Sequence, residues 1–504
     1  MGELSNLRHL ELEETYDLVN FPESIGELVL LRTLSKFIVG AEPNSLKIGG
    51  LKLLSHLQGS LEIAGLEYIA NVNEVSEVKL KEKKNVRSLT FDFNIKGGIL
   101  FYRVFNHGGD DEEDGDDNEK MEIILKGLEP PEGLEELKIR YYPGREFPFW
   151  ISSLSNLVKL EVYKCEACVS LPCLGNLAFL EEVELTGIPA VQRLGREFYG
   201  VDTEVSNKDL FPRLKKLSIN KMYNLIEWEF PFLDNKKTMP RLSVLEILDC
   251  PKLNVLPYQA HDDAFPALSE LYIKGCSSQL LIGAGKLKLL KKLELDGINS
   301  LQCLDEVLSE ISEETKLEKL TFKNMKMWEE WSLPFGIDVF SNLVELEISS
   351  CNSLRTLPAL GRLKNLESLV LYDFYCPNLS GRQPCLPSRL QELWLESDLG
   401  EFSTSLPVNN SYHKLTDVKI DGSECEVLPS GFDKFTAIKR LEISECDHLD
   451  FLPEHFRPLN NLQELLINDC SLLSKSCIKG ENWSTTARTP SIWIDGKPVT
   501  PSYA

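Results

Sequence analysis

Three cysteines, Cys165, Cys168 and Cys173, form a C-x2-C-x4-C group, which is the arrangement in this chain that most suggests a metal site. Thiolates bind zinc well, but a structural zinc site normally has four ligands. Neither a second C-x2-C pair nor a suitably spaced pair of histidines follows. We therefore expect no metal site at these cysteines.

Two other segments resemble binding loops. The residues GAGK, 283–286, look like the end of a phosphate-binding loop, but Leu280 and Leu287 stand where such a loop needs Gly and Ser or Thr. The acidic segment DDEEDGDDNE, 110–119, would place Met121 where a calcium loop needs a bidentate Glu. Its carboxylates repel one another and cannot bury apolar area, so we expect a disordered acidic insertion over 105–120. We predict no cofactor.

The residues that general acid–base or nucleophilic catalysis requires are not grouped. The seven histidines are scattered along the chain, and no G-x-S-x-G nucleophile motif occurs. The sequence therefore predicts a protein that is not an enzyme.

A repeat accounts for most of the remaining pattern. The residues NLVELEISSC, 342–351, have counterparts that end in cysteine at 156–165, 241–250, 267–276, 437–446 and 461–470. Between Leu134 and Leu462, most successive units of this kind start 22 to 28 residues apart. This is the period of a leucine-rich repeat.

The repeat predicts an α/β solenoid of the leucine-rich-repeat horseshoe type. Because side chains alternate along a strand, Leu346 and Ile348 should point inward and Glu347 outward. Each unit would add one strand to a parallel sheet on the concave face, and loops with short 3-10 or α-helical turns would form the convex face. The cysteine that ends each unit should pack in the turn after the strand rather than form a disulfide.

The same spacing divides the chain into four parts. Residues 1–104 form less regular repeats, and 105–120 form the acidic insertion. Residues 121–480 form the regular array, and 481–504 form a closing cap and tail.

Charge and hydropathy restrict the partners. The chain has 54 basic and 78 acidic residues among 504, whereas binding to a phosphate backbone requires clustered Lys and Arg. We therefore expect no nucleic acid partner. No run of about 18 apolar residues suggests a membrane span, so we expect a cytoplasmic or nucleocytoplasmic location.

Several longer segments resemble the leucine-rich repeats of plant intracellular nucleotide-binding leucine-rich-repeat (NLR) disease-resistance proteins of the coiled-coil class. The resemblance is carried by LPCLGNLAFLEEVELTGIPAVQRLGREFYG (171–200), FPRLKKLSINKMYNLIEWEF (211–230), LEKLTFKNMKMWEEWSLPFG (317–336), ENWSTTARTPSIWIDG (481–496) and residues 33–93. It extends over nearly the whole chain. For residues 33–93 the resemblance implies an early-repeat region of the amino-terminal repeats with a helical segment near 73–84.

The resemblance implies a sensor of pathogen effectors or of a guarded host protein. It also implies contact with the nucleotide-binding domain of the same full-length receptor, which the repeats help to hold in its resting state. This sequence has no nucleotide-binding loop, and Leu7, Leu10 and Leu12 already follow an interior-strand pattern, so no polar cap covers the first coil. We therefore expect the carboxyl-terminal part of a longer receptor.

The alternation of side chains along each expected strand predicts which residues could contact a partner. Six apolar or aromatic side chains should face outward on the concave sheet: Tyr163, Tyr272, Val370, Tyr372, Trp394 and Leu466. Val370, Tyr372 and Trp394 come from adjacent repeats and should form one patch. Five lysines form basic spots that could contact a switch domain or could simply aid solubility: Lys215, Lys216, Lys221, Lys291 and Lys292.

Two other functions remain open. One is a stand-alone leucine-rich-repeat adaptor or decoy that mediates protein–protein interaction without a nucleotide switch. The other is an extracellular receptor, for which sequons at Asn378, Asn409 and Asn482 would accept glycans. The lack of a signal segment and of the L-x-G-x-I-P pattern argues against the second.

Overall fold

The computed structural model consists of two compact units, Met1–Leu268 (unit 1) and Ser269–Ala504 (unit 2). The structure describes the following residues: 4–12, 15, 18–94, 113–200, 209–231, 237–260, 264–298, 308, 315–332, 340–373, 378–379, 385–396, 405–408, 411–422, 426–450, 452, 461–479 and 489–499.

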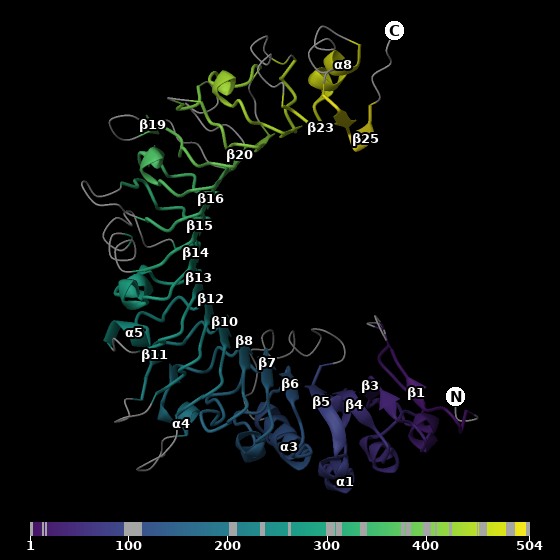
Figure 1. The fold of residues 1–504 in the computed structure, drawn as a ribbon. Coiled ribbons are helices and arrows are strands. Elements are labelled where there is room, and N and C mark those ends of the chain that lie inside the picture. The colour runs from purple at the N-terminus through teal and green to yellow at the C-terminus, as the bar shows by residue number, and fades with distance from the viewer. Residues whose placement is uncertain are drawn as a thin grey trace. The chain divides into compact units, whose positions relative to one another are not determined.

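Unit 1 is built from short strands joined by turns and short helices (Figure 1). Its strands are β1 (His9–Leu10), β2 (Thr33–Leu34), β3 (Lys36–Ile38), β4 (Gln58–Ala64), β5 (Asn85–Asp92), β6 (Glu136–Arg140), β7 (Lys159–Tyr163), β8 (Glu182–Thr186), β9 (Arg193–Leu194), β10 (Lys216–Asn220), β11 (Glu227–Trp228) and β12 (Val244–Leu248). Its α-helices are α1 (Asn73–Glu77), α3 (Glu113–Gly127), α4 (Arg196–Tyr199) and α5 (Pro257–Ala260). Its 3-10 helices are η1 (Glu23–Glu27), η2 (Ile48–Leu53), η3 (Leu66–Tyr68), η4 (Leu80–Glu82) and η5 (Phe149–Ser153).

Unit 2 repeats the same plan. Its strands are β13 (Glu270–Lys274), β14 (Lys292–Asp296), β15 (Lys319–Lys323), β16 (Glu345–Ser349), β17 (Thr356–Leu357), β18 (Ser368–Tyr372), β19 (Asn378–Leu379), β20 (Glu392–Glu396), β21 (Asp417–Asp421), β22 (Arg440–Ser444), β23 (Glu464–Asn468), β24 (Ser491–Ile494) and β25 (Lys497–Pro498). Its helices are η6 (Ser278–Leu281), η7 (Ala284–Lys286), η8 (Leu360–Arg362), η9 (Phe432–Lys434) and α8 (Ser471–Lys479).

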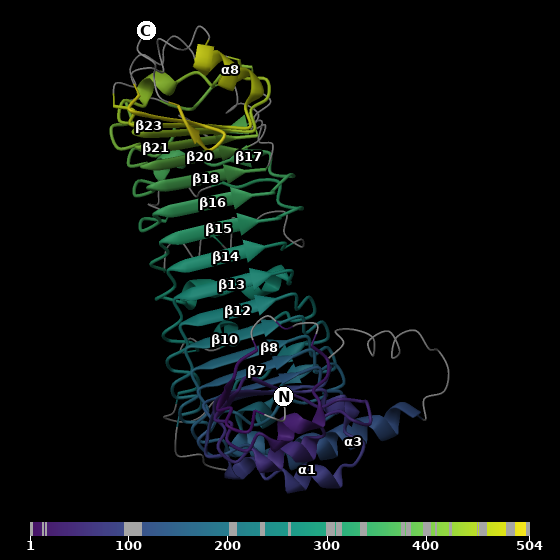
Figure 2. The same cartoon turned by 90° about the vertical axis from the view of Figure 1, so that its right-hand side faces the viewer.

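Each unit has one main sheet of parallel strands that lie side by side (Figure 2). In unit 1 the order is β3-β4-β5-β6-β7-β8-β10-β12. In unit 2 the order is β13-β14-β15-β16-β18-β20-β21-β22-β23-β24, and β25 is antiparallel to β24. The parallel sheet and the solenoid fold predicted from the repeat are therefore confirmed.

Alternation along each strand separates the core from the solvent face. In β16, Leu346 is 1% exposed and Ile348 is 0% exposed, whereas Glu347 between them lies on the solvent face. The inward side chains of successive coils stack into one continuous apolar core in each unit, and burial of that core is the main source of stability in such repeats.

The turn that ends each strand explains the recurring cysteine. The residue before it has a positive φ, as in Ser350 (51°) and Asp469 (50°), and this turns the chain off the strand. The buried thiol that follows donates to backbone carbonyls: Cys351 Sγ lies 3.3 Å from the Ser349 oxygen, and Cys470 Sγ lies 3.2 Å from the Asn468 oxygen. The prediction that these cysteines pack in the turn is confirmed.

Two local expectations need adjustment. The helical segment expected near 73–84 consists of the short helices α1 and η4. The expected disordered insertion is wrong for residues 113–120, which form the first turns of α3; residues 105–112 lie outside the described residues. The helix is anchored by the buried side chains of Met121, Ile124 and Leu125.

Candidate ligand-binding surface

The solvent face of the unit 2 sheet carries one central row of side chains, with one residue from each strand. Backbone pairing aligns the row in the order Tyr272, Glu294, Thr321, Glu347, Val370, Trp394, Lys419, Glu442, Leu466 and Trp493. Neighbouring strands lie about 4.8 Å apart. Exposed side chains on adjacent strands of this row are therefore close enough to touch the same partner, whereas Thr321 is fully buried.

Most charged residues of the sheet face pair with one another. Lys323 lies 3.4 Å from Glu294 and 3.3 Å from Glu347, and so bridges carboxylates on the two neighbouring strands. In unit 1, Lys159 pairs with two carboxylates of one neighbouring strand, β8, at 3.2 Å from Glu182 and 3.0 Å from Glu184. Exposed pairs of this kind contribute little stability, but they leave the face largely self-neutralised.

Val370, Tyr372 and Trp394 interrupt this pattern in unit 2. Val370 and Trp394 are register partners on β18 and β20. The rings of Tyr372 and Trp394 are 6.2 Å apart and inclined at 66°, which is an edge-on contact. All three side chains are half-buried, so they keep solvent-facing surface. The structure therefore brings these three residues together, and we call them the aromatic patch.

Lys419 borders the aromatic patch on β21. Its Nζ atom lies 4.2 Å from the centroid of the Trp394 ring, 2.9 Å from Asp421 and 3.6 Å from Glu442. Burial by itself would lower the pKa of Lys419, but hydrogen bonds and the charges of Asp421 and Glu442 outweigh it and raise that pKa. Lys419 therefore stays protonated over the indole, where a cation–π contact is favourable.

The indole nitrogen of Trp394 is left without a hydrogen bond. Its Nε1 atom is buried and has no partner among the described residues. A buried unpaired donor typically costs about 1–3 kcal/mol.

Leu466 lies apart from the aromatic patch, because Lys419 and Glu442 occupy the row between them. Its neighbour on the last parallel strand is Trp493, whose Nε1 donates to Ser491 Oγ at 2.9 Å. Trp493 lies in the segment 481–504, which the sequence predicts to be a closing cap and tail, and it is not among the six predicted contact residues. Its position in the same alternation as Leu466 was the signal that could have identified it.

Tyr272 is a partner of charged residues rather than part of the patch. Its hydroxyl donates to Glu270 at 2.6 Å and accepts from Lys292 Nζ at 2.8 Å. The same ammonium group lies 4.6 Å from the Tyr272 ring centroid. This phenol is thus held by its own neighbours on the sheet.

Tyr163 belongs to unit 1 and forms a separate pair with Tyr141. Their rings are 5.5 Å apart and nearly perpendicular, and Lys164 Nζ lies 5.5 Å from the Tyr163 centroid and 5.7 Å from that of Tyr141. Tyr141 was missed because it follows its strand in a left-handed conformation, with φ of 56°. Strand alternation does not predict the direction of such a residue.

The five candidate lysines differ in their pairing. Four of them contact acidic residues: Lys215 with Glu181 (2.6 Å), Lys216 with Glu246 (3.1 Å), Lys291 with Glu318 (2.9 Å) and Lys292 with Glu294 (4.0 Å). Lys221 is exposed and makes no salt bridge to any described residue. Lys221 is therefore the member of this set whose charge is most available to another domain.

The segments that resembled metal or phosphate sites have structural roles. Cys168 Sγ lies 3.0 Å from the Gly144 carbonyl oxygen, and the GAGK residues form the turn that contains η7. In the part of the chain that the structure describes, no group of three His, Cys, Asp or Glu residues is arranged to hold a metal ion. Across the same ranges, every helix is too short or too polar to cross a membrane.

Comparison with known proteins agrees with this geometry. Residues 48–188 and 286–374 match a family model described as R13L1/DRL21 leucine-rich repeats. Disease resistance RPP13-like protein 1 of Arabidopsis thaliana is 28% identical over 328 residues, which cover 64% of this chain and 27% of that protein. Disease resistance protein RGA2 of Solanum bulbocastanum is 27% identical over 336 residues, which cover 66% of this chain and 27% of that protein.

The chain therefore spans less than a third of the length of these curated relatives. Among solved structures, a leucine-rich-repeat protein of Leptospira interrogans is similar, with a TM-score of 0.47 and 18% identity over 98% of this chain and 97% of that chain. The strand register and the repeat show the leucine-rich-repeat fold, and the repeats are similar to those of the plant proteins.

Proposed function

Because its leucine-rich repeats are of the type found in plant disease-resistance proteins, we propose that this chain is the sensing and autoinhibitory region of a plant NLR immune receptor. In this role it binds a pathogen effector or a guarded host protein in the cytoplasm or the nucleus and catalyses no reaction. It also contacts the nucleotide-binding domain of the same full-length receptor.

The observation that carries the sensing role is the aromatic patch on the unit 2 sheet. Tyr and Trp bury large rigid surfaces at low entropic cost and are common anchors of protein interfaces. The patch lies among side chains that pair with one another, so it offers apolar area on a face that otherwise consists mainly of ion pairs.

The sensing role can be tested by co-expressing the chain in leaves with a panel of pathogen effectors and host proteins in a split-luciferase assay. We expect at least one partner whose signal is lost with Trp394→Ala. Phe149→Ala is the matched control, because Phe149 in unit 1 is 86% exposed and lies outside the patch. If every partner bound Trp394→Ala as well as the unchanged chain, the aromatic patch would not be the sensing site.

The autoinhibitory role is supported by the free charge of Lys221 beside the paired Lys215 and Lys216. Lys221→Glu in the full-length receptor should weaken contact with the nucleotide-binding domain and raise cell-death signalling without effector. Lys326→Glu is the control, because Lys326 is exposed and lies in unit 2. Partner binding without any change in signalling would instead favour a stand-alone adaptor or decoy.

A further inference from the structure

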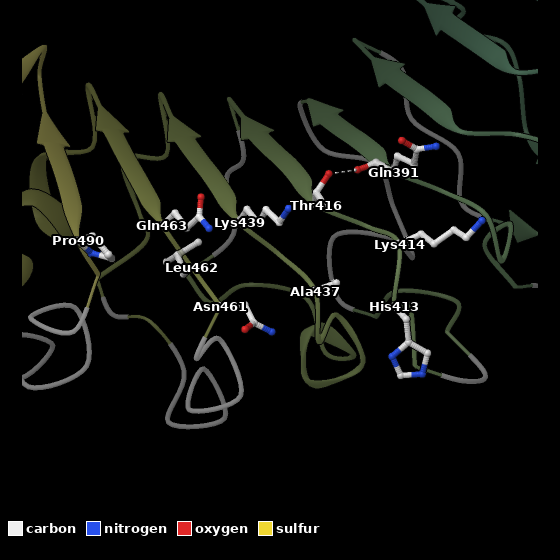
Figure 3. Close-up of a pocket in the computed structure, with 10 residues that line it drawn as sticks. All are labelled: Gln391, His413, Lys414, Thr416, Ala437, Lys439, Asn461, Leu462, Gln463 and Pro490. Carbon is white, nitrogen blue, oxygen red and sulfur yellow. Dashed lines mark hydrogen bonds between the residues drawn. The ribbon is translucent and has the colours of Figure 1, made fainter.

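A polar groove lies along the starts of the last parallel strands of unit 2, and its lining does not include Val370, Tyr372 or Trp394. It has a volume of about 750 Å³ and is lined by Gln391, His413, Lys414, Thr416, Ala437, Lys439, Asn461, Leu462, Gln463 and Pro490 (Figure 3). Five of these residues directly precede β20, β21, β22, β23 and β24: Gln391, Thr416, Lys439, Gln463 and Pro490.

Backbone hydrogen bonds hold this row in register. The amide of Lys439 donates to the Thr416 carbonyl at 2.8 Å, and the amide of Gln463 donates to the Lys439 carbonyl at 2.8 Å. The amide of Thr416 likewise donates to the Gln391 carbonyl at 2.9 Å. Because the coils are about 4.8 Å apart, the row presents evenly spaced side chains along one line, as Figure 3 shows.

The groove is unusual in its charge. Its described lining contains His413, Lys414 and Lys439 but no carboxylate, in a chain with 78 acidic residues. At the equivalent position in earlier coils of unit 2, Lys291 pairs with Glu318 at 2.9 Å. Lys414 and Lys439 are exposed and make no salt bridge within the described ranges. The groove therefore has positive charge that the chain itself does not neutralise.

Carboxylates also occur at the first residues of the strands beside this row. Asp417 accepts a hydrogen bond from the Thr416 hydroxyl at 2.6 Å, and Glu464 pairs with Arg440 at 3.3 Å. The remaining lining complements a peptide: the amides of Gln391 and Gln463 can both donate and accept, as a main chain requires. Leu462, Ala437 and Pro490 supply apolar surface between the polar groups.

We propose that this groove binds an extended acidic segment of a partner protein. Lys414 and Lys439 pair with its carboxylates, and Gln391 and Gln463 hydrogen-bond to its main chain. The inference goes beyond the sensing role of the aromatic patch, because it uses different side chains and requires neither Trp394 nor Tyr372.

The test measures fluorescence anisotropy of a labelled octapeptide of alternating Glu and Gly with the purified full chain. Lys414→Glu with Lys439→Glu should weaken binding by about tenfold, because each change replaces an attraction to the peptide's carboxylates by a repulsion, in a field that solvent screens. Lys414→Gln with Lys439→Gln should weaken it less, because these changes only remove the attraction. The matched control is Lys288→Glu with Lys326→Glu, which makes the same change in net charge at two other exposed lysines of unit 2. It should retain the affinity.

Equal weakening by the control pair would overturn the proposal, because the peptide would then respond only to overall charge. Failure of the unchanged chain to bind the acidic octapeptide more tightly than an octapeptide of alternating Lys and Gly would also overturn it. Displacement by inorganic phosphate, but not by sodium chloride of equal ionic strength, would define a phosphate site and reject a peptide groove. Trp394→Ala should leave the octapeptide bound, so failure of the aromatic patch and failure of the groove are distinguishable.

Discussion

Lys419 lies over the indole ring of Trp394, with its Nζ atom 4.2 Å from the ring centroid, while the same ammonium group reaches Asp421 and Glu442. Three adjacent strands, β20, β21 and β22, are thereby linked on the solvent face of the sheet. The arrangement fixes the orientation of Trp394 before any partner arrives. A preoriented aromatic side chain loses less entropy on binding than a mobile one.

Replacing Lys419 by Met should reduce the free energy of unfolding by about 1 kcal/mol. Met keeps an apolar chain on the indole but removes the cation–π contact and the ion pairs. Urea unfolding followed by circular dichroism measures the change, and Lys326→Met serves as the control because Lys326 is exposed and lies away from this cluster. An equally stable Lys419→Met protein would show that the contact contributes no stability.

Asp92 in unit 1 should lower the free energy of unfolding as pH rises, which is the opposite of the effect of a carboxylate with a lowered pKa. Burial raises its pKa to about 6, although the Asn94 amide, which donates to it at 2.8 Å, lowers the pKa. Since the folded-state pKa exceeds the unfolded one, the folded state binds more protons between about pH 4 and 6, and this residue's contribution falls as pH rises through that range.

Asp92→Asn should therefore be increasingly stabilising, relative to the unchanged chain, as pH rises from about 4 to about 6.5. Urea unfolding at a series of pH values would measure the difference between the two proteins. A difference that stays constant over this range would contradict the assignment of a raised pKa to Asp92.

Buried thiols should resist alkylation in the folded protein. Burial raises the pKa of Cys351 and that of Cys477 to about 12, and only a thiolate reacts rapidly. Peptide mass spectrometry after iodoacetamide treatment at about pH 8 should show slow labelling of both residues. Cys173, which is half-buried, should be labelled faster. Equal labelling rates for Cys351 and Cys173 before unfolding would contradict the structure.

The position of Cys351 should accept Asn but not Leu. Leucine-rich repeats use either Asn or Cys at this turn, and an Asn side chain can also bond to the carbonyls that the thiol now contacts. We expect Cys351→Asn to change unfolding free energy by less than about 1 kcal/mol and Cys351→Leu to cost about 1–3 kcal/mol through overpacking. Thermal unfolding of the two variants tests this ranking, and a more stable Leu variant would reverse it.

Much of the fold could be predicted because the repeat encodes strand phase directly. Leu346 and Ile348 pointed inward, Glu347 pointed outward and Cys351 followed in the turn, and the structure has all four as predicted. Side chains alternate between the two faces with a period of two residues. Once one side chain of a repeat is known to point inward, the directions of the equivalent side chains in the other repeats are known as well. The same phase brought Val370 and Trp394 together on adjacent strands.

The remaining features depend on contacts that no local pattern specifies. Lys216 pairs with Glu246 on the neighbouring strand, and the two residues lie 30 positions apart in the chain. Tyr141 turns toward Tyr163 only because of its left-handed backbone. Composition alone favoured disorder in the acidic segment. Helix α3 nevertheless begins within this segment, because Met121, Ile124 and Leu125, later in the same helix, are buried.

Hydroxyl-radical footprinting of the chain with and without a partner identified in the luciferase assay would test the central claim most directly. Mass spectrometry would measure oxidation of Tyr372 and Trp394, with Tyr223 of unit 1, which is 48% exposed, as the internal reference. The account predicts that the partner lowers oxidation of Tyr372 and Trp394 and leaves Tyr223 unchanged. A bound partner that left both residues as reactive as before would contradict the claim that the aromatic patch is the sensing surface.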